Sequence, residues 1–504
     1  QPYGYLNLSN LYLIENKVES AQELLFQYIS DIGFNEEIVN HLGKICLQFK
    51  QYDQLKKLFL SSKLNINKKT HYQHTLFFLE GRYYEELSKI NEAIKSYKKS
   101  IKCNKNFEPA YISLLNLLES VNDFENLEKF INTGLNLPKF EKKYLLIYYK
   151  SLLLYRLNRF EESETIIKKN KLEKKLINNN FFNQKLLDLR AKNNEKLKNH
   201  KTTFKYIEQR NNFLYNLESN RKFDKKIIFE TIDKYSKFYN SKNLRNIPII
   251  KNKTKNRLFF LVGFPRSGTT LLDTILRTHS KITVLEERPY LLETRHKFFR
   301  ENNNRLEALK NITAKQIHEL RDFYFNKINF NNISEKEIIV DKLPLSIIEL
   351  GFIKIIFPES KIILALRHPC DVVISCFFSY FKINEAMINF LKWDDTINFY
   401  NKTFELLENY EDNFNINYHR IRYEDLILNF KNQIHKLLEY VGLKYENELE
   451  NYIKTAKKRE KISTPSYSQV IKPLYTSSIG RWENFKDIRN PEKNLIKWIH
   501  KFNY

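Results

Sequence analysis

The segment of the chain with the clearest chemical character is GFPRSGTT, residues 263–270. It follows an apolar stretch, LFFLV, and leads into leucines and isoleucines at helical spacing, so it is expected to join a strand to a helix. Backbone N–H groups at the start of a helix have no partner within the helix, and together with the helix dipole they attract an anion. The segment is therefore predicted to bind a phosphate through Pro265, Arg266, Ser267, Gly268, Thr269 and Thr270.

The residue after the second glycine limits which phosphate-containing ligands the loop is expected to bind. Loops that hold a nucleoside triphosphate continue with Lys and then Ser or Thr, because that Lys reaches the β- and γ-phosphates. Here Thr269 stands in the Lys position. This argues against an ATPase or a kinase, and it indicates a ligand with a phosphate at the loop and no γ-phosphate.

A second phosphate-binding pair is predicted in LRHPCDVVISCFF, residues 366–378. Arg367 is expected at the end of a strand, and Ser375 follows eight residues later, two turns into the next helix. A guanidinium and a hydroxyl at this spacing suit a dianionic phosphate, because the planar fork of Arg matches two phosphate oxygens.

Four segments in this order resemble the sulfotransferases that use 3′-phosphoadenosine 5′-phosphosulfate (PAPS). PRSGTT is similar to the loop that holds the 5′-phosphosulfate in that family, and LRHPCDVVISCFF to its 3′-phosphate motif. RYEDL, residues 422–426, is similar to the segment that places an aromatic ring near the adenine. TPSYSQVIKPLYTSSIGRW, residues 464–482, resembles a late segment of the protein-tyrosine sulfotransferases. The resemblance covers residues 255–490 and implies the sulfotransferase fold.

The resemblance also implies roles for individual residues. Glu287 lies 21 residues after Arg266, where the tyrosylprotein enzymes have their catalytic base, and its neighbour Glu286 is the other candidate. Lys342, after an apolar strand, is expected to stabilise charge on the bridging oxygen of the leaving phosphate. The catalytic residues implied are Glu287, Lys342, Arg266 and Ser466. The residues implied to bind the cofactor are Pro265, Arg266, Ser267, Gly268, Thr269, Thr270, Arg367, Ser375, Tyr423, Ser466 and Arg481.

The chain departs from the family at one point. The family has a further arginine in the helix of the 3′-phosphate motif, and no counterpart lies near Ser379. Either the 3′-phosphate is bound more weakly, or another basic residue such as Lys382 replaces that arginine. No metal is implied, since the transferred sulfuryl group carries little charge compared with a phosphoryl group.

The elements that must position these residues begin near residue 251. RLFFLV, EIIVDK, KIILALRHP and YHRIRYEDL are strand-like, and a stretch with helical period follows each. Such alternation predicts an α/β fold of P-loop type, in which a parallel sheet has helices on both faces. Ligands of these sheets bind at the carboxyl ends of the strands, which is where the polar residues above are expected.

The first part of the chain has a different texture. Residues 1–168 are predicted to form helix after helix with a loose repeat, in which Ala21, Leu55, Ala93, Leu127 and Ser163 occupy one position. The spacing near 34 residues is typical of an all-α, tetratricopeptide-like solenoid, and a generic helical bundle is the alternative. Residues 169–250 are expected to form a charged helical connector, and residues 251–504 the sulfotransferase domain.

Composition excludes some classes of protein. The chain is 42% hydrophobic, which is typical of a globular protein, and its formal charge is +25. The basic residues are spread along the predicted helices, so we expect an anionic ligand or acidic partner rather than specific binding of nucleic acid. No stretch has the length of an apolar membrane span, and no signal-peptide pattern begins at residue 1, so a cytoplasmic location is expected. Because residue 1 is not Met, it is open whether the natural N-terminus is present.

Taken together, the residues indicate a PAPS-dependent sulfotransferase. The expected acceptor is a protein tyrosine, presented as a peptide to the helical repeats, because repeat solenoids bind extended peptides on their surface. A glycan or a small-molecule hydroxyl is the rival acceptor. The alternative from another class is a protein-interaction scaffold in which the sulfotransferase domain is inactive.

Overall fold

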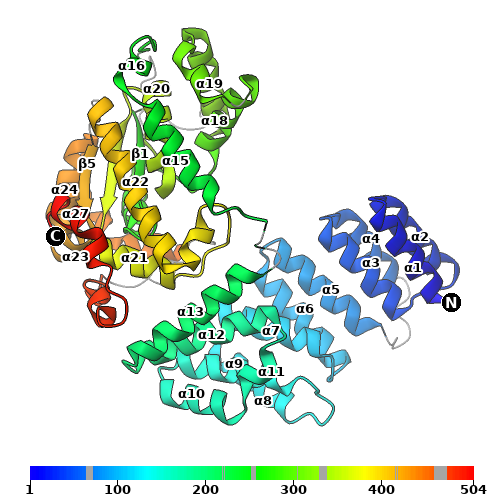
Figure 1. Cartoon of the computed structure of the whole chain (residues 1–504). Coiled ribbons are helices and arrows are strands. Elements are labelled where there is room, and N and C mark those ends of the chain that lie inside the picture. Colours follow the sequence, from blue (N-terminus) through cyan, green and yellow to red (C-terminus); the bar gives the residue numbers. More distant parts are fainter. Residues whose placement is uncertain are drawn as a thin grey trace. The chain divides into compact units, whose positions relative to one another are not determined.

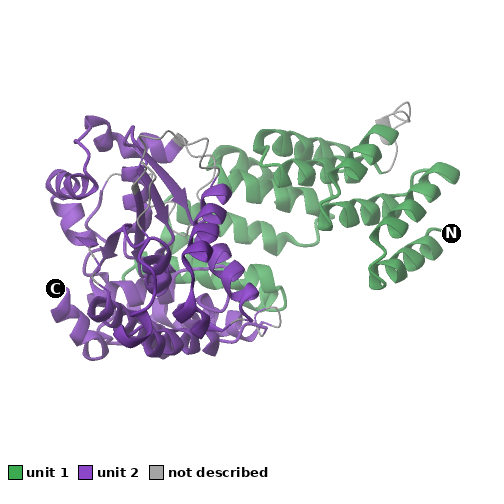
Figure 2. Ribbon diagram, turned by 90° about the horizontal axis from the view of Figure 1, so that it is seen from above, with its two compact units in different colours: residues 1–199 green, residues 200–504 purple. Residues whose placement is uncertain are grey.

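The computed structural model describes the chain except for residues 64–71, 218–219, 221, 251–256, 304, 329–337, 415, 417 and 459–473. It divides into two compact units, residues 1–199 and residues 200–504, coloured separately in Figure 2. We call them the helical unit and the sheet unit. Their boundary lies within residues 169–250, the predicted connector, so that α11 and α12 belong to the first unit and α13, α15 and α16 to the second. The three-part division of the chain remains a prediction.

The described part of the helical unit consists of antiparallel helices joined by short turns (Figure 1). They are α1 (Pro2–Ile14), α2 (Val18–Asp31), α3 (Glu36–Gln48), α4 (Tyr52–Lys63), α5 (Gln73–Glu86), α6 (Ile90–Cys103), α7 (Glu108–Ser120), α8 (Phe124–Leu135), α9 (Lys143–Arg156), α10 (Phe160–Lys169), α11 (Leu172–Leu176) and α12 (Asn180–Lys196).

The five residues aligned by the sequence repeat occupy equivalent places. Each is the fourth residue of its helix, in α2, α4, α6, α8 and α10, and each has an exposed fraction of 0%. Where such a residue is Ala or Ser, neighbouring helices can approach closely, because the side chain fills little space. The described helices therefore repeat in pairs, and the assignment of these pairs to the tetratricopeptide class stays a prediction.

The sheet unit alternates strands and helices. Its elements are α13 (His200–Asn216), α15 (Lys226–Phe238), α16 (Ser241–Leu244), β1 (Arg257–Gly263), α17 (Thr269–Leu276), β2 (Ile282–Glu286), α18 (Tyr290–Glu301), η1 (Leu306–Asn311), α19 (Ala314–Lys327), β3 (Ile338–Lys342), η3 (Pro344–Glu349), α20 (Leu350–Ile356), β4 (Lys361–Leu366), α21 (Pro369–Phe378), η4 (Met387–Leu391), α22 (Trp393–Asn413), β5 (Tyr418–Arg422), α23 (Tyr423–Leu428), α24 (Phe430–Val441), η5 (Asn447–Asn451), α25 (Tyr452–Lys458), η6 (Arg481–Phe485) and α27 (Glu492–Lys501).

The five strands form one parallel sheet in the order β2-β3-β1-β4-β5. On one face, Phe259 and Leu261 of β1 pack in a core with α17, α24 and α25. On the other face, the Phe260 ring lies 6.0 Å from the ring of Phe357, after α20, and Asp341 of β3 accepts a hydrogen bond from α19. The predicted α/β fold, with helices on both faces of a parallel sheet, is confirmed.

Four of the strands coincide with the four predicted from sequence, and β2 was not predicted. It has five residues, ITVLE, and only Ile282 and Val284 are buried, so it lacks the long apolar run that marks a central strand. β2 is an edge strand of the sheet. Its omission matters because β2 ends at one candidate base, Glu286, and the other, Glu287, follows directly.

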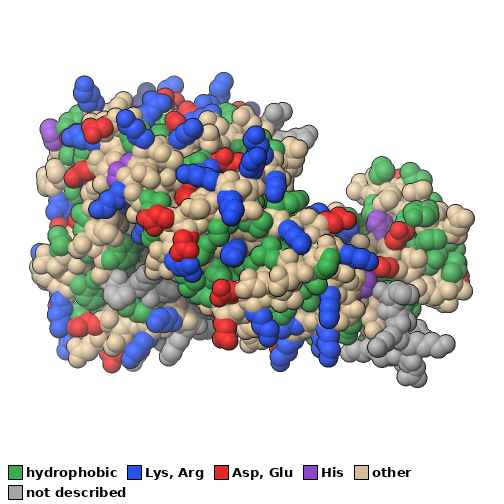
Figure 3. Space-filling model, turned by 90° about the horizontal axis from the view of Figure 1, so that it is seen from below, with side chains coloured by type: hydrophobic (Ala, Val, Ile, Leu, Met, Phe, Trp, Pro, Cys, Tyr) green, Lys and Arg blue, Asp and Glu red, His purple; other side chains and the backbone are tan. Residues whose placement is uncertain are grey.

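Two findings concern the molecule as a whole. Among the described helices, none is long and apolar enough to pass through a membrane. Lys and Arg side chains are scattered over the face shown in Figure 3, with acidic and apolar side chains between them. On that face the positive charge does not form a single stripe of the kind that nucleic-acid-binding proteins present.

Candidate active site at the carboxyl end of the parallel sheet

The predicted phosphate-binding loop joins β1 to α17, and two close approaches fix its path. A Cβ added to Gly263 would lie 2.5 Å from the carbonyl oxygen of Ala365 in β4. Gly268 has φ +89°, and a Cβ there would lie 2.8 Å from Cδ2 of Tyr423. Both positions therefore require glycine, the second also because its backbone is left-handed. Arg266 has φ +71°, a conformation that costs a side-chain-bearing residue energy and that clusters at functional sites.

The helix that follows the loop presents free amide groups to it. α17 begins at Thr269, and Leu271 and Leu272 are the first of its residues to donate to a carbonyl of the loop, both to Gly268 O at 3.1 Å. The amides of Thr269 and Thr270 precede these bonds and donate to no carbonyl in the described ranges of the chain. This is the arrangement in which a helix N-terminus binds an anion.

Three guanidinium groups converge beside the loop. Arg266 Nε donates to Ser375 Oγ of α21 at 3.0 Å, and Arg367 Nη1, at the end of β4, donates to Arg266 O at 3.3 Å. Burial, together with the positive charges of Arg367 and Arg481, lowers the pKa of Arg266 to about 10. Such repulsion between buried cations is relieved by an anion bound among them. The structure thus brings together the loop and the two residues of the predicted 3′-phosphate motif.

Arg367 lies against a tyrosine, and its Nε–H is available to a ligand. Its guanidinium is 5.1 Å from the centre of the Tyr423 ring, and Nη2 donates to Ser478 O. The Tyr423 hydroxyl is 2.8 Å from Ser478 Oγ. Arg367 Nε is buried and has no hydrogen-bond partner among the residues that the structure describes. A buried guanidinium donor without a partner is costly, so this atom fits a site for a phosphate oxygen.

The described part of the late segment that resembles protein-tyrosine sulfotransferases, from residue 474 on, contacts the first turn of α21. Asp371, in the first turn of α21, accepts hydrogen bonds from Gly480 N at 2.8 Å and Trp482 N at 2.9 Å. These bonds position Arg481, whose guanidinium lies 5.0 Å from the ring centre of Phe378. Ser466, also singled out from the sequence, lies outside the described residues.

A second charged cluster surrounds Lys342 at the end of β3. The Lys342 side chain is fully buried, and its Nζ lies 2.8 Å from Glu287 Oε1, 3.7 Å from Glu286 Oε1 and 3.7 Å from Asp273 Oδ2. The register of the parallel strands produces the first two contacts, because Glu286 of β2 pairs with Lys342. Glu287 N also donates to Lys342 O at 2.7 Å. The predicted base candidates and the predicted cation therefore meet at one edge of the sheet.

The two glutamates differ in what they can reach. The Glu287 side chain is 30% exposed and has the shorter contact with Lys342, whereas that of Glu286 is 16% exposed. Glu287 also has φ +46°, directly after the last residue of β2, which turns the chain away from the sheet. Exposure and proximity to Lys342 favour Glu287 as the group that meets an acceptor.

Asp273 and Arg277 were not singled out in the sequence and belong to the Lys342 cluster. Asp273 has no exposed side-chain surface, and its Oδ1 accepts from Arg277 Nε at 3.0 Å and Nη2 at 2.8 Å. The sequence signal for this pair was an acid in an otherwise apolar helix, followed four residues later by Arg. By itself that pattern indicates an ordinary ion pair within a helix. The third partner, Lys342, comes from a distant strand and cannot be predicted from the spacing.

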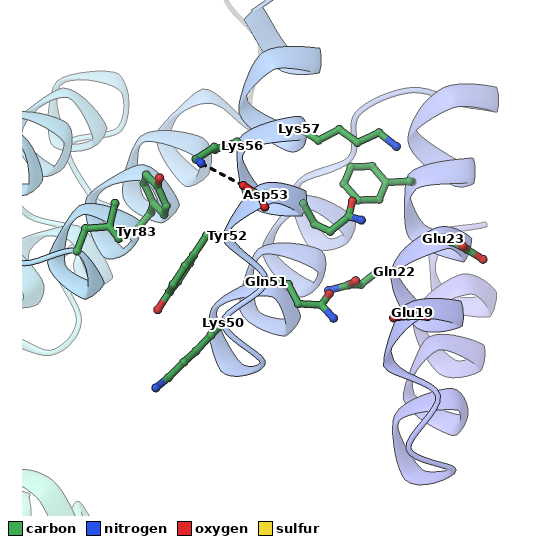
Figure 4. Close-up of a pocket in the computed structure, with 13 residues that line it drawn as sticks. Glu19, Gln22, Glu23, Lys50, Gln51, Tyr52, Asp53, Lys56, Lys57 and Tyr83 are labelled. Carbon is green, nitrogen blue, oxygen red and sulfur yellow. Dashed lines mark hydrogen bonds and ion pairs between the residues drawn. The ribbon is translucent and has the colours of Figure 1, made fainter. Parts of the chain in front are cut away.

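A groove of about 820 Å³ lies in the helical unit, and none of the predicted site residues lines it. Figure 4 shows amide, aromatic and charged side chains along it, with Lys56 bonded to Asp53. Its lining comes from α2, the turn before α4, α4 itself and the end of α5 with the residue after it: Glu19, Gln22, Glu23, Phe26, Lys50, Gln51, Tyr52, Asp53, Gln54, Lys56, Lys57, Tyr83 and Leu87. Its size is that of a site for a small molecule or a short peptide segment.

Comparison with solved structures finds sulfotransferase domains. The sulfotransferase domain from the curacin biosynthetic pathway is 18% identical, with a TM-score of 0.36, and covers 49% of this chain and 98% of that one. The sulfotransferase domain from the Synechococcus PCC 7002 olefin synthase is 19% identical, with a TM-score of 0.36, and covers 51% of this chain and 98% of that one.

Comparison with sequences finds relatives that match a little under half of the chain. An uncharacterized protein of Aquifex aeolicus is 27% identical over 251 residues, 48% of this chain and 32% of that protein. Protein-tyrosine sulfotransferase A of Caenorhabditis elegans is 23% identical over 235 residues, 44% of this chain and 60% of that protein. Protein-tyrosine sulfotransferase 2 of Gallus gallus is 22% identical over 236 residues, 45% of this chain and 62% of that protein. The chain thus spans from 32% to 62% of the length of these relatives. Residues 259–447 match the model of the sulfotransferase family, and the proteins to which this chain is similar include protein-tyrosine sulfotransferases.

Proposed function

We propose that the sheet unit binds PAPS and transfers its sulfuryl group to a hydroxyl acceptor. The observation that carries this proposal is the buried Nε of Arg367, which has no partner among the described residues. Nη1 of the same guanidinium donates to Arg266 O in the phosphate-binding loop. The fit to PAPS is chemical: the ligand has two separate phosphates, and the site offers two sets of donors. The loop and Arg266 suit the 5′-phosphosulfate, and Arg367 with Ser375 suits the 3′-phosphate.

Bound PAPS would supply the sulfuryl group and a phosphate that leaves with the electron pair of the broken S–O bond. The chain's own residues supply the rest of the chemistry. We infer that Glu287 takes the proton of the acceptor hydroxyl, and its support is that Glu287 is the most exposed carboxylate of its cluster. Lys342 and Arg266 would stabilise the negative charge that the leaving phosphate gains. The roles of Ser466 and Tyr423 as nucleotide contacts remain part of the same proposal.

For the acceptor we propose a protein tyrosine. Support comes from the relatives named protein-tyrosine sulfotransferases and from the attached helical unit, whose paired helices are a common platform for peptides. The groove lined by α2, α4 and α5 is a described surface of that unit with room for a peptide segment. A glycan or small-molecule hydroxyl is the second candidate. The hydrogen bond from Lys342 to Glu287 speaks against an inactive scaffold. It holds a carboxylate that could accept the acceptor's proton beside a cation that could stabilise the leaving group.

Calorimetric titration tests the nucleotide. The product PAP should bind the wild type tightly, ATP with Mg²⁺ should give no signal, and Arg367→Ala should lose PAP binding. Preference for ATP would overturn the interpretation of the loop, and no nucleotide binding would favour the scaffold.

Transfer assays test the chemistry and the acceptor. Lys342→Ala should reduce transfer about 10²- to 10³-fold and largely retain PAP binding, and loss of binding would mean that its role is wrongly assigned. Deletion of residues 1–168 should reduce transfer to protein acceptors much more than PAP binding. If every acceptor is used as before, the repeats do not select the substrate.

A further inference from the structure

We propose that Asp273 of α17 is a positioning residue for sulfuryl transfer, a role that rests on the proposed function. It holds the Lys342 ammonium in place at the sheet edge while Glu287 takes up the proton of the acceptor. Asp273 does not touch the acceptor or the donor, and it acts through Lys342.

The contacts of Asp273 make it a fixed link between two elements. Its Oδ1 is anchored by two hydrogen bonds from Arg277, one helical turn further along α17. Its Oδ2 lies 3.7 Å from Lys342 Nζ, which comes from β3. Neither the Asp273 nor the Lys342 side chain has any exposed surface. Coulomb attraction between such buried charges is much stronger than in water, so the pair is held firmly.

The three carboxylates around Lys342 cannot share one role. Glu287 is 30% exposed and Glu286 16%, whereas Asp273 is fully buried. A proton acceptor must reach the hydroxyl that it deprotonates, and the two oxygens of Asp273 already face Arg277 and Lys342. Its negative charge therefore stays constant during the reaction.

This constancy matters at the moment of transfer. When Glu287 gains a proton it becomes neutral, and the carboxylate closest to the Lys342 ammonium no longer balances its positive charge. The negative charge of Asp273 still balances it, and so keeps the Lys342 ammonium in the cluster. Because α17 also carries the amides of Thr269 and Thr270 at its start, Asp273 fixes Lys342 relative to the phosphate-binding loop.

The test compares Asp273→Asn with Asp341→Asn. Asp273→Asn keeps the shape of the side chain and an oxygen for Arg277 but removes the negative charge. Asp341→Asn is the control: it removes a buried carboxylate one residue from Lys342, on the opposite face of β3, where Tyr324 donates a hydrogen bond to it. Transfer of radiolabelled sulfuryl from PAPS to a tyrosine-containing peptide and to p-nitrophenol is measured. For Asp273→Asn we expect kcat to fall about 10- to 100-fold, less than for loss of a direct contact, with KM for PAPS and PAP affinity within about twofold. Asp341→Asn should keep wild-type kcat.

A double-mutant cycle with Lys342→Ala shows whether Asp273 acts through the lysine. In that background, Asp273→Asn should lower the residual rate by less than about twofold, because the partner is already absent. Arg277→Gln leaves Asp273 charged but less firmly held, so a several-fold fall in kcat with unchanged PAP affinity is expected. This variant also carries the test if Asp273→Asn does not fold.

The outcomes separate the role of Asp273 from the proposed function. If the wild type transfers sulfuryl and both Asp273→Asn and Arg277→Gln keep its kcat, the function stands and the positioning role is overturned. The same holds if Asp273→Asn weakens PAP binding as much as it lowers kcat, or if its effect is undiminished beside Lys342→Ala. If the wild type neither binds PAP nor transfers sulfuryl, the proposed function is overturned, and the role of Asp273 with it.

Discussion

Arg266 and Ser375 are 109 residues apart in the sequence, and Arg266 Nε donates to Ser375 Oγ at 3.0 Å. The bond joins the loop after β1 to the middle of α21, the helix after the neighbouring strand β4. It links the two halves of the predicted nucleotide site, one for each phosphate. Both side chains are therefore held in place before a ligand arrives, which reduces the entropy lost on binding.

Ser375→Ala should weaken PAP binding about tenfold. The variant removes a hydrogen bond to a charged group, worth about 1.5 kcal/mol, and a hydroxyl that we propose contacts the 3′-phosphate. Titration calorimetry measures the change. Ser379→Ala is the matched control, since Ser379 lies one turn further on and its hydroxyl donates only to Ser375 O among the described partners. Equal affinities of the wild type and Ser375→Ala would remove Ser375 from the binding site.

Two substitutions of Arg266 distinguish the contribution of its backbone conformation from that of its guanidinium. Arg266→Ala and Arg266→Gly should both lose transfer and most PAP affinity, because both lack the guanidinium. Since φ is +71°, Gly relieves a cost of about 1 kcal/mol that Ala retains. Urea denaturation should therefore show Arg266→Gly to be the more stable of the two. If Ala is as stable as Gly, the loop does not have this conformation in solution.

The choice between Glu286 and Glu287 as base can be made with two amide variants. Glu287→Gln should reduce kcat by about 10²- to 10⁴-fold, the range for loss of a general base, whereas Glu286→Gln should cost less than about tenfold. The reason is that Glu287 has the more exposed side chain and the shorter contact with Lys342. Steady-state kinetics at saturating PAPS measures both. The opposite ranking would assign the base to Glu286.

Helix α13 should prove part of the folded sheet unit. Arg210, fully buried, donates from Nη2 to Phe378 O at 3.1 Å, and Asn211 Nδ2 donates to Phe377 O at 2.8 Å, so they bind carbonyls at the end of α21. Arg210→Met leaves these buried acceptors with fewer donors and should lower the free energy of unfolding by about 3 kcal/mol. Gln209→Ala, at an exposed neighbour, should have little effect.

Truncated chains also test whether α13 is part of the folded sheet unit. A chain that begins at residue 200 keeps α13, whereas one that begins at residue 251 loses it together with α15 and α16. The shorter chain should unfold at a lower urea concentration. If both chains have the same midpoint, residues 200–250 are a connector that the sheet does not need.

Asp341 should make stability depend on pH. Burial raises its pKa to about 7, despite a hydrogen bond from Tyr324, whereas in the unfolded chain it titrates near its ordinary value. The folded state therefore binds the proton more tightly, so the contribution of Asp341 to stability is lost as the pH rises from about 4 through about 7. Asp341→Asn should be more stable than the wild type at pH 8, and this gain should disappear near pH 4. A gain independent of pH would show that the charge is not the cause.

The sequence by itself determined the class of the fold and the candidate residues. Four of the five strands, the glycine loop and the pair Arg367 and Ser375 were readable because each is encoded locally: an apolar run, a turn that needs glycine, or a fixed spacing along one strand and helix. The repeat in residues 1–168 was readable for the same reason, since one buried position recurs in alternate helices.

The tertiary structure alone decided which of these residues meet. The strand order β2-β3-β1-β4-β5 places Glu286 beside Lys342, and no sequence spacing reveals this register. β2 itself escaped prediction because an edge strand of five residues has too little buried surface to leave a pattern. Asp273 looked like the acid of a helical ion pair until β3 brought an ammonium to its other oxygen. Local chemistry fixes what each residue can do, but long-range packing fixes its partners, and a charge acquires its role only from them.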